Sequence, residues 1–171
     1  MKNRARRTLI GAACAAVFLV AATPLQAQAA PFVVFDIQSA SPTAPPLLDI
    51  RQDGTVFLRR KASDTSATRR KLTDQQLANL RAWLLDDLHI TDVRAPDIGA
   101  QINSLGATSG RLFAVADARP MNIIIHHDGG VHTVTFRGTA IAAATFPEID
   151  ALQRLNAAEQ ALLQVFTELS K

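Results

Sequence analysis

The sequence predicts an α+β fold, an antiparallel sheet of about six strands with two amphipathic helices on one face. Two observations indicate the sheet: short β-branched and aromatic runs bounded by turn residues, and Asp-Gly pairs flanked by apolar residues at 53–54 and 128–129. A third indicates the helices, because two longer segments carry leucine at helical spacing. Helices on one face of an antiparallel sheet form a common layered architecture.

The first 29 residues predict a cleaved export signal. A cationic start, MKNRARR, precedes an apolar run over 9–22 and small residues at Ala27 and Ala29, the order of a signal peptide cleaved after Ala29. The apolar run is shorter than the roughly 20 residues that a spanning helix needs. We therefore expect a signal peptide over 1–29, a single α+β domain over 30–171, and a periplasmic or secreted location.

Cleavage would change both the charge and the thiol content of the chain. The chain has 18 Lys and Arg against 15 Asp and Glu; four of the cations and none of the acids precede residue 30, which leaves 14 against 15. The sole cysteine, Cys14, also lies in the leader. The mature domain would therefore have no disulfide and no thiol nucleophile, and its charge gives no indication of a nucleic-acid partner.

The first half of the domain predicts three strands and a helix. We expect a strand over 31–39, two short strands over 47–61 around the first Asp-Gly pair, and a polar loop over 62–70. The helix over 71–88 begins with a capping box, Thr73 at the N-cap and Gln76 three residues later. Its apolar stripe consists of Leu77, Leu80, Leu84 and Leu88.

The second half is predicted to end in a long helix. Residues 89–109 show no clean period and are expected to form a loop, followed by a strand over 110–118 and a hairpin over 121–138. Thr145 and Pro147 signal the start of the last helix, with a break expected near Asn156. A shift of 75 positions superimposes both Asp-Gly pairs and Leu77 on Leu152, so a duplicated β-β-β-α unit, convergence and chance all remain open.

The stretch HHDGGVH at 126–132 is the one concentration of metal-ligand residue types. A two-residue turn at Asp128-Gly129 would pair Ile125 with His132 and gather the hairpin's apolar side chains on one face, whereas a three-residue turn would split them. We favour the first register because it buries more aliphatic surface. It leaves His127 and His132 together near the open end of that face, an adventitious two-histidine metal site at best, since zinc sites use three or four ligands.

Other chemistry is weakly represented. The chain has no HExxH, GxSxG or P-loop motif, so we predict no catalytic residue and no cofactor. The adjacent acids at 86–87 are expected to be solvated. The basic runs at 59–61 and 69–71 are expected either to guard a strand edge or to form a cationic rim for an anionic partner.

The order of elements resembles a known family. The helix LTDQQLANLRAWL, the hairpin NIIIHHDGGVHTVTF and the closing FPEIDALQRL, over most of residues 32–155, are similar in layout to the emfourin-like proteins, small bacterial inhibitors of thermolysin-like metalloproteases. The resemblance implies a protease as partner. The family's opening strand usually runs into a Gly-Gly turn, where this chain has QSASPTAPP, so no functional residue is transferred.

These observations favour a non-catalytic domain that binds another envelope or secreted protein, for example as a protease inhibitor. The loops at 39–46 and 95–109 and the edge of the sheet are the expected contact regions. Two alternatives come from other classes: a metal-assisted hydrolase using His127 and His132 with a third ligand, and a carrier of a small apolar molecule. No nucleic acid and no stable membrane insertion after cleavage are expected.

Overall fold

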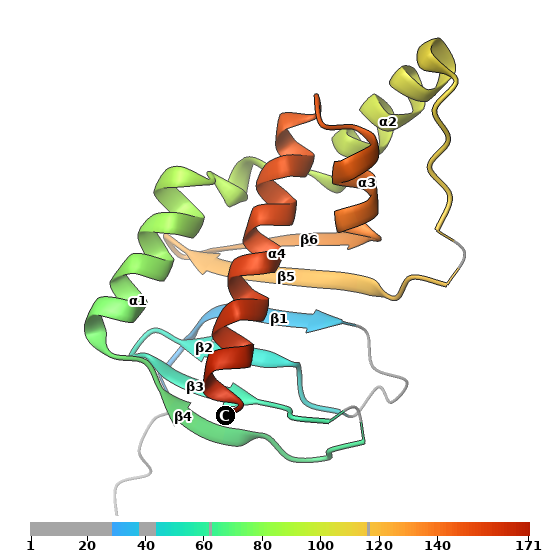
Figure 1. Cartoon of the computed structure of the whole chain (residues 1–171). Helices are drawn as coiled ribbons and strands as arrows, with labels where there is room; N and C mark the ends of the chain where they lie inside the picture. Colours follow the sequence, from blue (N-terminus) through green and yellow to red (C-terminus); the bar gives the residue numbers. More distant parts are fainter. Residues whose placement is uncertain (1–28, 38–43, 62, 116) are drawn as a thin grey trace, which may run out of the picture.

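The strands form one six-stranded antiparallel sheet, as predicted, and lie in the order β4-β3-β2-β1-β5-β6 (Figure 1). The computed structural model describes residues 29–37, 44–61, 63–115 and 117–171. The strands are β1 (Pro31–Ile37), β2 (Leu48–Arg51), β3 (Thr55–Leu58), β4 (Thr68–Lys71), β5 (Pro120–His127) and β6 (Gly130–Arg137).

Strand β1 lies at the centre and joins the two halves of the chain. Val33 pairs with Ile50 of β2 on one side and with Ile125 of β5 on the other. Antiparallel pairing directs both neighbours back toward the start of β1. The β2–β3 and β5–β6 turns therefore lie at the same end of the sheet.

The helices cover one face of the sheet, in agreement with the predicted fold class. Helices α1 (Asp74–Arg81), α3 (Thr139–Thr145) and α4 (Asp150–Leu169) lie over this face, and α2 (Ala95–Ser109) lies beyond the β6 side (Figure 1). Helix α4 crosses the sheet from β6 toward β4, where the C-terminus lies. Arg60 on the β3 side donates to the carbonyl of Ser170.

Helix α1 begins as its sequence predicts. The Thr73 Oγ1 accepts from the Gln76 backbone N–H at 3.2 Å, and the Thr73 N–H donates to Gln76 Oε1 at 2.9 Å. This reciprocal pair satisfies two of the donors that a helix start leaves free. The helix continues as a π-helical turn over Ala82–Asp87, in which the Leu88 N–H reaches back to the Trp83 carbonyl at 2.9 Å.

The core lies between the sheet and α1 and α4. Val33, Phe35, Leu48, Ile50 and Ile123 from the sheet are fully enclosed, as are Leu84, Leu152, Leu155 and Leu162 from the helices. The predicted leucine stripe of the first helix is confirmed, since all four of its members are buried. The opposite face of the sheet carries no helix among the described residues (Figure 1).

Two loop predictions were wrong. Residues 68–70 of the expected polar loop, together with Lys71 from the start of the expected helix, form β4, whose basic side chains gave no apolar signal. The expected loop over 89–109 contains a 3-10 helix (Ile90–Asp92) and α2. Pro96 lies in the first turn of α2, where proline is common. The helix buries only Ile98 and Ile102, so its apolar side is too narrow to give a clear helical periodicity in the sequence.

The expectations for 110–118 and for the last helix also need correction. The described residues of 110–118 form no strand, and residue 116 lies outside the described residues. Helix α3 was not predicted, and α4 starts after Ile149 rather than at the Thr145–Pro147 signal. Helix α4 continues through Asn156 without a break.

The duplicated β-β-β-α unit is not confirmed, because the two Asp-Gly turns differ in length. In the first hairpin Ile50 pairs with Val56 around a longer loop, and Val56 is buried. In the second hairpin His127 pairs with Gly130 around two residues, and Val131, which matches Val56 after the shift, is 64% exposed. A change of one residue in the turn exchanges the faces of the following strand.

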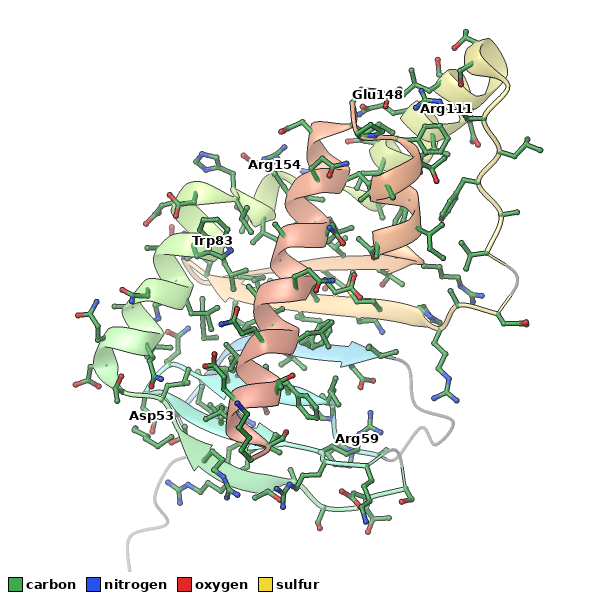
Figure 2. The ribbon with its side chains drawn as sticks, in the orientation of Figure 1. Asp53, Arg59, Trp83, Arg111, Glu148 and Arg154 are labelled. Carbon is green, nitrogen blue, oxygen red and sulfur yellow. The ribbon has the colours of Figure 1, made fainter. Side chains whose placement is uncertain are left out.

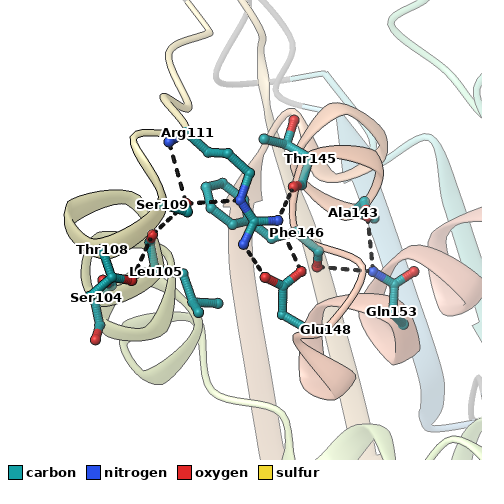
Figure 3. A network of polar contacts seen from close by, with 10 residues as sticks. All are labelled: Ser104, Leu105, Thr108, Ser109, Arg111, Ala143, Thr145, Phe146, Glu148 and Gln153. Atoms are coloured by element: carbon teal, nitrogen blue, oxygen red, sulfur yellow. Dashed lines mark hydrogen bonds and ion pairs between the residues drawn. The ribbon is translucent and has the colours of Figure 1, made fainter.

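A polar clamp around Arg111 fastens the end of α2 to the α3–α4 corner (Figure 3). The Arg111 guanidinium lies 4.8 Å from the Phe146 ring centre, donates to the Thr145 carbonyl at 2.8 Å, and forms a two-point ion pair with Glu148. The hydrogen bond from Arg111 holds the pKa of the Glu148 carboxyl below its usual value. The segment that leaves α2 is thus fixed although it forms no strand.

We expect Leu155→Ala to destabilise the domain by roughly 2–5 kcal/mol, because truncation of an enclosed leucine removes apolar burial and leaves a cavity. The midpoint of urea unfolding measures this. The matched control is Leu112→Ala at a side chain that is 88% exposed, with an expected change below about 0.5 kcal/mol. Equal losses in the two variants would contradict the assigned core.

Glu148→Gln is expected to change the pH dependence of unfolding. Because the folded-state pKa of Glu148 is lowered, its stabilisation is complete above the ordinary value of 4.5 and is lost as pH falls through the folded value. The free-energy difference between wild type and variant should therefore shrink from neutral pH to about pH 3, measured by urea unfolding. Asp86→Asn, which removes an exposed carboxylate elsewhere on the surface, is the control and should change the stability at neutral pH by less than about 0.5 kcal/mol.

Candidate functional site

The histidine-bearing hairpin adopts the favoured register. Ile125 pairs with His132 and His127 with Gly130, around a turn in which Asp128 has φ 48° and Gly129 φ 73°. These left-handed angles at both turn positions suit a tight hairpin, and Asp and Gly are residues that adopt them. The prediction from apolar alternation is confirmed.

The structure brings the predicted metal pair to one face but gives each histidine a local partner. His132 Nε2 lies 2.9 Å from the Val93 carbonyl oxygen, and His127 Nε2 lies 3.0 Å from Asp128 Oδ2. His126 alternates to the opposite face. Among the described residues, no three His, Cys, Asp or Glu side chains are grouped so that they could hold a metal ion.

The hairpin-tip pocket, as we name it, is a hollow of about 510 Å³ at the end of the sheet where both turns lie. Its lining combines apolar and polar side chains: Ala30, Pro31, Phe32, Gln52, Arg81, Leu85 and residues 126–131. Arg81 and Gln52 were not singled out from the sequence. Their neighbours come from distant segments, so no local pattern could indicate them.

The β4 edge of the sheet is short and guarded. Its four residues, TRRK, carry three cations. Because the Leu72 N–H bonds to the Gly54 carbonyl at 2.9 Å, alternation directs the backbone groups of Arg69 outward. The Arg70 side chain donates to the Arg69 carbonyl at 3.1 Å and thereby occupies one of these groups. Cations and a short strand are common protections against unwanted pairing.

The β6 edge is longer and lacks these protections. His127 and Gly130 flank a two-residue turn and form a hydrogen-bonded pair, so the backbone groups of Val131, Thr133, Thr135 and Arg137 point away from β5. We call these four residues the β6 edge. No backbone hydrogen bond to them from outside the sheet occurs among the described residues, and all four side chains are exposed.

Trp83, the sole tryptophan of the chain, lies between α1 and α4 (Figure 2). Trp83 is 43% exposed and borders two hollows of about 760 and 370 Å³. Ala161 of α4 lines both hollows. The sequence signal was a tryptophan beside a leucine stripe, which does not distinguish a core residue from a surface one.

The remaining surface predictions have mixed outcomes. Arg59 of the first basic run is buried, 3.0 Å from Asp36 and donating to the Pro45 carbonyl at 2.8 Å, so it belongs to no exposed rim (Figure 2). The adjacent acids Asp86 and Asp87 are exposed, as expected. Of the loop 39–46, residues 39–43 lie outside the described residues, and 95–109 is the helix α2 rather than a loop.

No helix of the described residues is both long enough and apolar enough to cross a membrane. Comparison with protein-family models, curated proteins and solved structures finds no significant match to the chain.

Proposed function

We propose that the chain is an exported, non-catalytic protein-binding domain that accepts an extended segment of its partner as an additional strand on the β6 edge. The observation that supports this most is the difference between the two edges of the sheet. The β4 edge has four residues and three cations, whereas the β6 strand has eight residues and one cation at its end. Long, uncharged edges invite pairing with another chain.

The backbone of β6 supplies the hydrogen-bonding groups for such a segment. Alternate residues from 131 to 137 direct N–H and C=O groups outward. An added strand that pairs with them would satisfy groups that otherwise bond only to water, as in other cases of strand addition. These hydrogen bonds join backbone to backbone and do not depend on the partner's side chains. The β6 edge could therefore pair with extended segments of different sequence.

The side chains of the β6 edge define the partner segment further. Val131, Thr133 and Thr135 are β-branched and project from the face that carries no helix among the described residues. Cross-strand pairs between β-branched residues stabilise a sheet. Arg137 follows at the far end of the strand. The best partner is therefore an extended segment of β-branched residues with an acidic residue opposite Arg137.

We further propose a protease as the first partner to test, because of the resemblance to emfourin-like inhibitors. Purified thermolysin is the defined probe, with its residual peptidase activity as the readout. Inhibition that is lost with a blocked β6 edge would support both the partner and the surface. Full thermolysin activity at a large excess of the domain would reject this protease class and leave strand addition to be decided by cross-linking.

A photo-crosslinking residue, p-benzoylphenylalanine, placed at Thr135 is expected to give adducts of discrete mass in the cell envelope, whereas the same residue at Arg69 of β4 should give none. Thr133→Pro should reduce the Thr135 adducts by about tenfold. Proline removes an outward N–H and leaves the ladder to β5 intact, which edge strands tolerate.

Thr133→Val is the matched control, since valine keeps the N–H and favours strands. Its adducts should equal those of the wild type. Circular dichroism checks that both variants are folded. Adducts that persist in folded Thr133→Pro, or that form equally from the β4 position, would reject the β6 edge as the binding surface.

Export is tested separately, by intact mass and N-terminal sequencing of the chain recovered from a bacterial periplasm or medium. We expect a mature chain that begins at Ala30, because small residues occupy 27 and 29. Ala30 already belongs to the fold, since the Gln52 N–H donates to its carbonyl at 2.8 Å. Recovery of the chain in the cytoplasm with residues 1–29 attached would contradict the proposal.

A further inference from the structure

We propose that the hairpin-tip pocket binds a small organic anion, a carboxylate or phosphate group on a short apolar body, with Arg81 as the residue that contacts the anionic group. The proposal does not depend on strand addition and stands whether or not the β6 edge binds a partner, although Val131 belongs both to the pocket lining and to the β6 edge. Its volume of about 510 Å³ lies within the range of roughly 300–1,000 Å³ that small-molecule sites occupy.

Arg81 is held in place by groups from two other segments. Its guanidinium lies 4.9 Å from the centre of the Phe32 ring, and Nη2 donates to the Gln52 carbonyl at 3.0 Å and to the Gln52 side-chain oxygen. Gln52 in turn donates to the carbonyls of Pro31 at 3.3 Å and His126 at 3.4 Å. A guanidinium fixed in this way loses little conformational freedom when it binds an anion.

The charge of Arg81 has no carboxylate partner among the described residues. Four other arginines that are at least partly buried do have one: Arg51 pairs with Asp49, Arg59 with Asp36, Arg111 with Glu148 and Arg154 with Asp150. Arg70 of β4, which is also partly buried, resembles Arg81 in that its printed partner is a carbonyl oxygen. Arg81 donates only to neutral oxygens, and its Nε is buried without a partner. A partly buried cation that lacks a counter-ion gains most from an added anion, because charge-assisted bonds are the strongest hydrogen bonds.

The rest of the lining defines the ligand. Phe32, Leu85 and Val131 provide apolar surface, which suits a short hydrocarbon or aromatic body. His126, His127 and the backbone N–H of the turn residue Gly129 add groups that can donate hydrogen bonds. Asp128 is the one acid of the lining; its side chain is 86% exposed, and Oδ2 lies against His127. The pocket therefore combines one uncompensated cation with an apolar wall.

The test follows ¹⁵N-labelled protein by NMR during titration with acetate, benzoate, inorganic phosphate and phenyl phosphate, each at ionic strength matched with sodium chloride. We expect saturable shifts at the Arg81 side chain and at the Gly129 and Gly130 amides. Benzoate or phenyl phosphate should bind at least about tenfold more tightly than acetate or phosphate, because the body adds apolar contact. Comparison of these two ligands decides between a carboxylate and a phosphate as the anionic group.

Arg81→Gln should weaken binding at least about tenfold, and Arg69→Gln, which removes the same charge from β4, less than about twofold. Arg81→Lys keeps the charge without the planar fork and should give an intermediate affinity. If Arg81→Gln does not fold, the test rests on two other results: the positions of the chemical-shift changes in the wild type and the affinity of Arg81→Lys. Shifts that do not saturate, shifts centred away from Arg81, or equal losses in the Arg81 and Arg69 variants would overturn the proposal.

Discussion

The pairing of β1 with β2 on one side and β5 on the other is the constraint on which the molecule depends. Val33 and Phe35 are fully enclosed at this centre, and the two strands that β1 joins lie far apart in the sequence, since β2 ends at Arg51 and β5 begins at Pro120. Antiparallel pairing on both sides of β1 brings both hairpin turns to the start of β1. Gln52 of one turn bonds to Pro31 and to His126 beside the other, so the hairpin-tip pocket is a direct consequence of the sheet order.

An open sheet built around a central strand must end in two edges, and these edges are treated differently in this chain. Strand β4 is the fourth strand from the first half and ends at the start of α1, which keeps it short. Strand β6 forms a hairpin with β5, and β5 pairs along the length of the central strand β1. Because β6 pairs with β5 residue by residue, β6 is as long as β5. Natural sheets usually protect a long edge. The lack of cations along residues 130–136 is therefore an observation that needs a reason, and a partner strand supplies one.

The predictable parts of the fold are those specified by local patterns. The capping box at Thr73 and the two-residue turn at Asp128 were predicted because neighbouring residues alone determine them. Helix α2 was missed because its buried contribution is small, and β4 because its four residues carry no apolar period. Arg59 was expected at the surface, yet its side chain is buried and forms an ion pair with Asp36 of β1. The site around Arg81 joins three distant segments, and only the folded chain brings these together.

The two proposed sites meet at the turn of the last hairpin. Gly130 and Val131 line the hairpin-tip pocket, and Val131 is also the first residue of the β6 edge. The tip of a hairpin has few neighbours, so a ligand that contacts it and a strand that pairs beyond it act on the same short segment. If both bind more tightly to one ordered conformation of this turn, each must raise the affinity of the other by the same factor, because coupling between two sites is reciprocal. A ligand with no preference between conformations of the turn would leave strand addition unchanged, and the two sites would then share residues without sharing regulation.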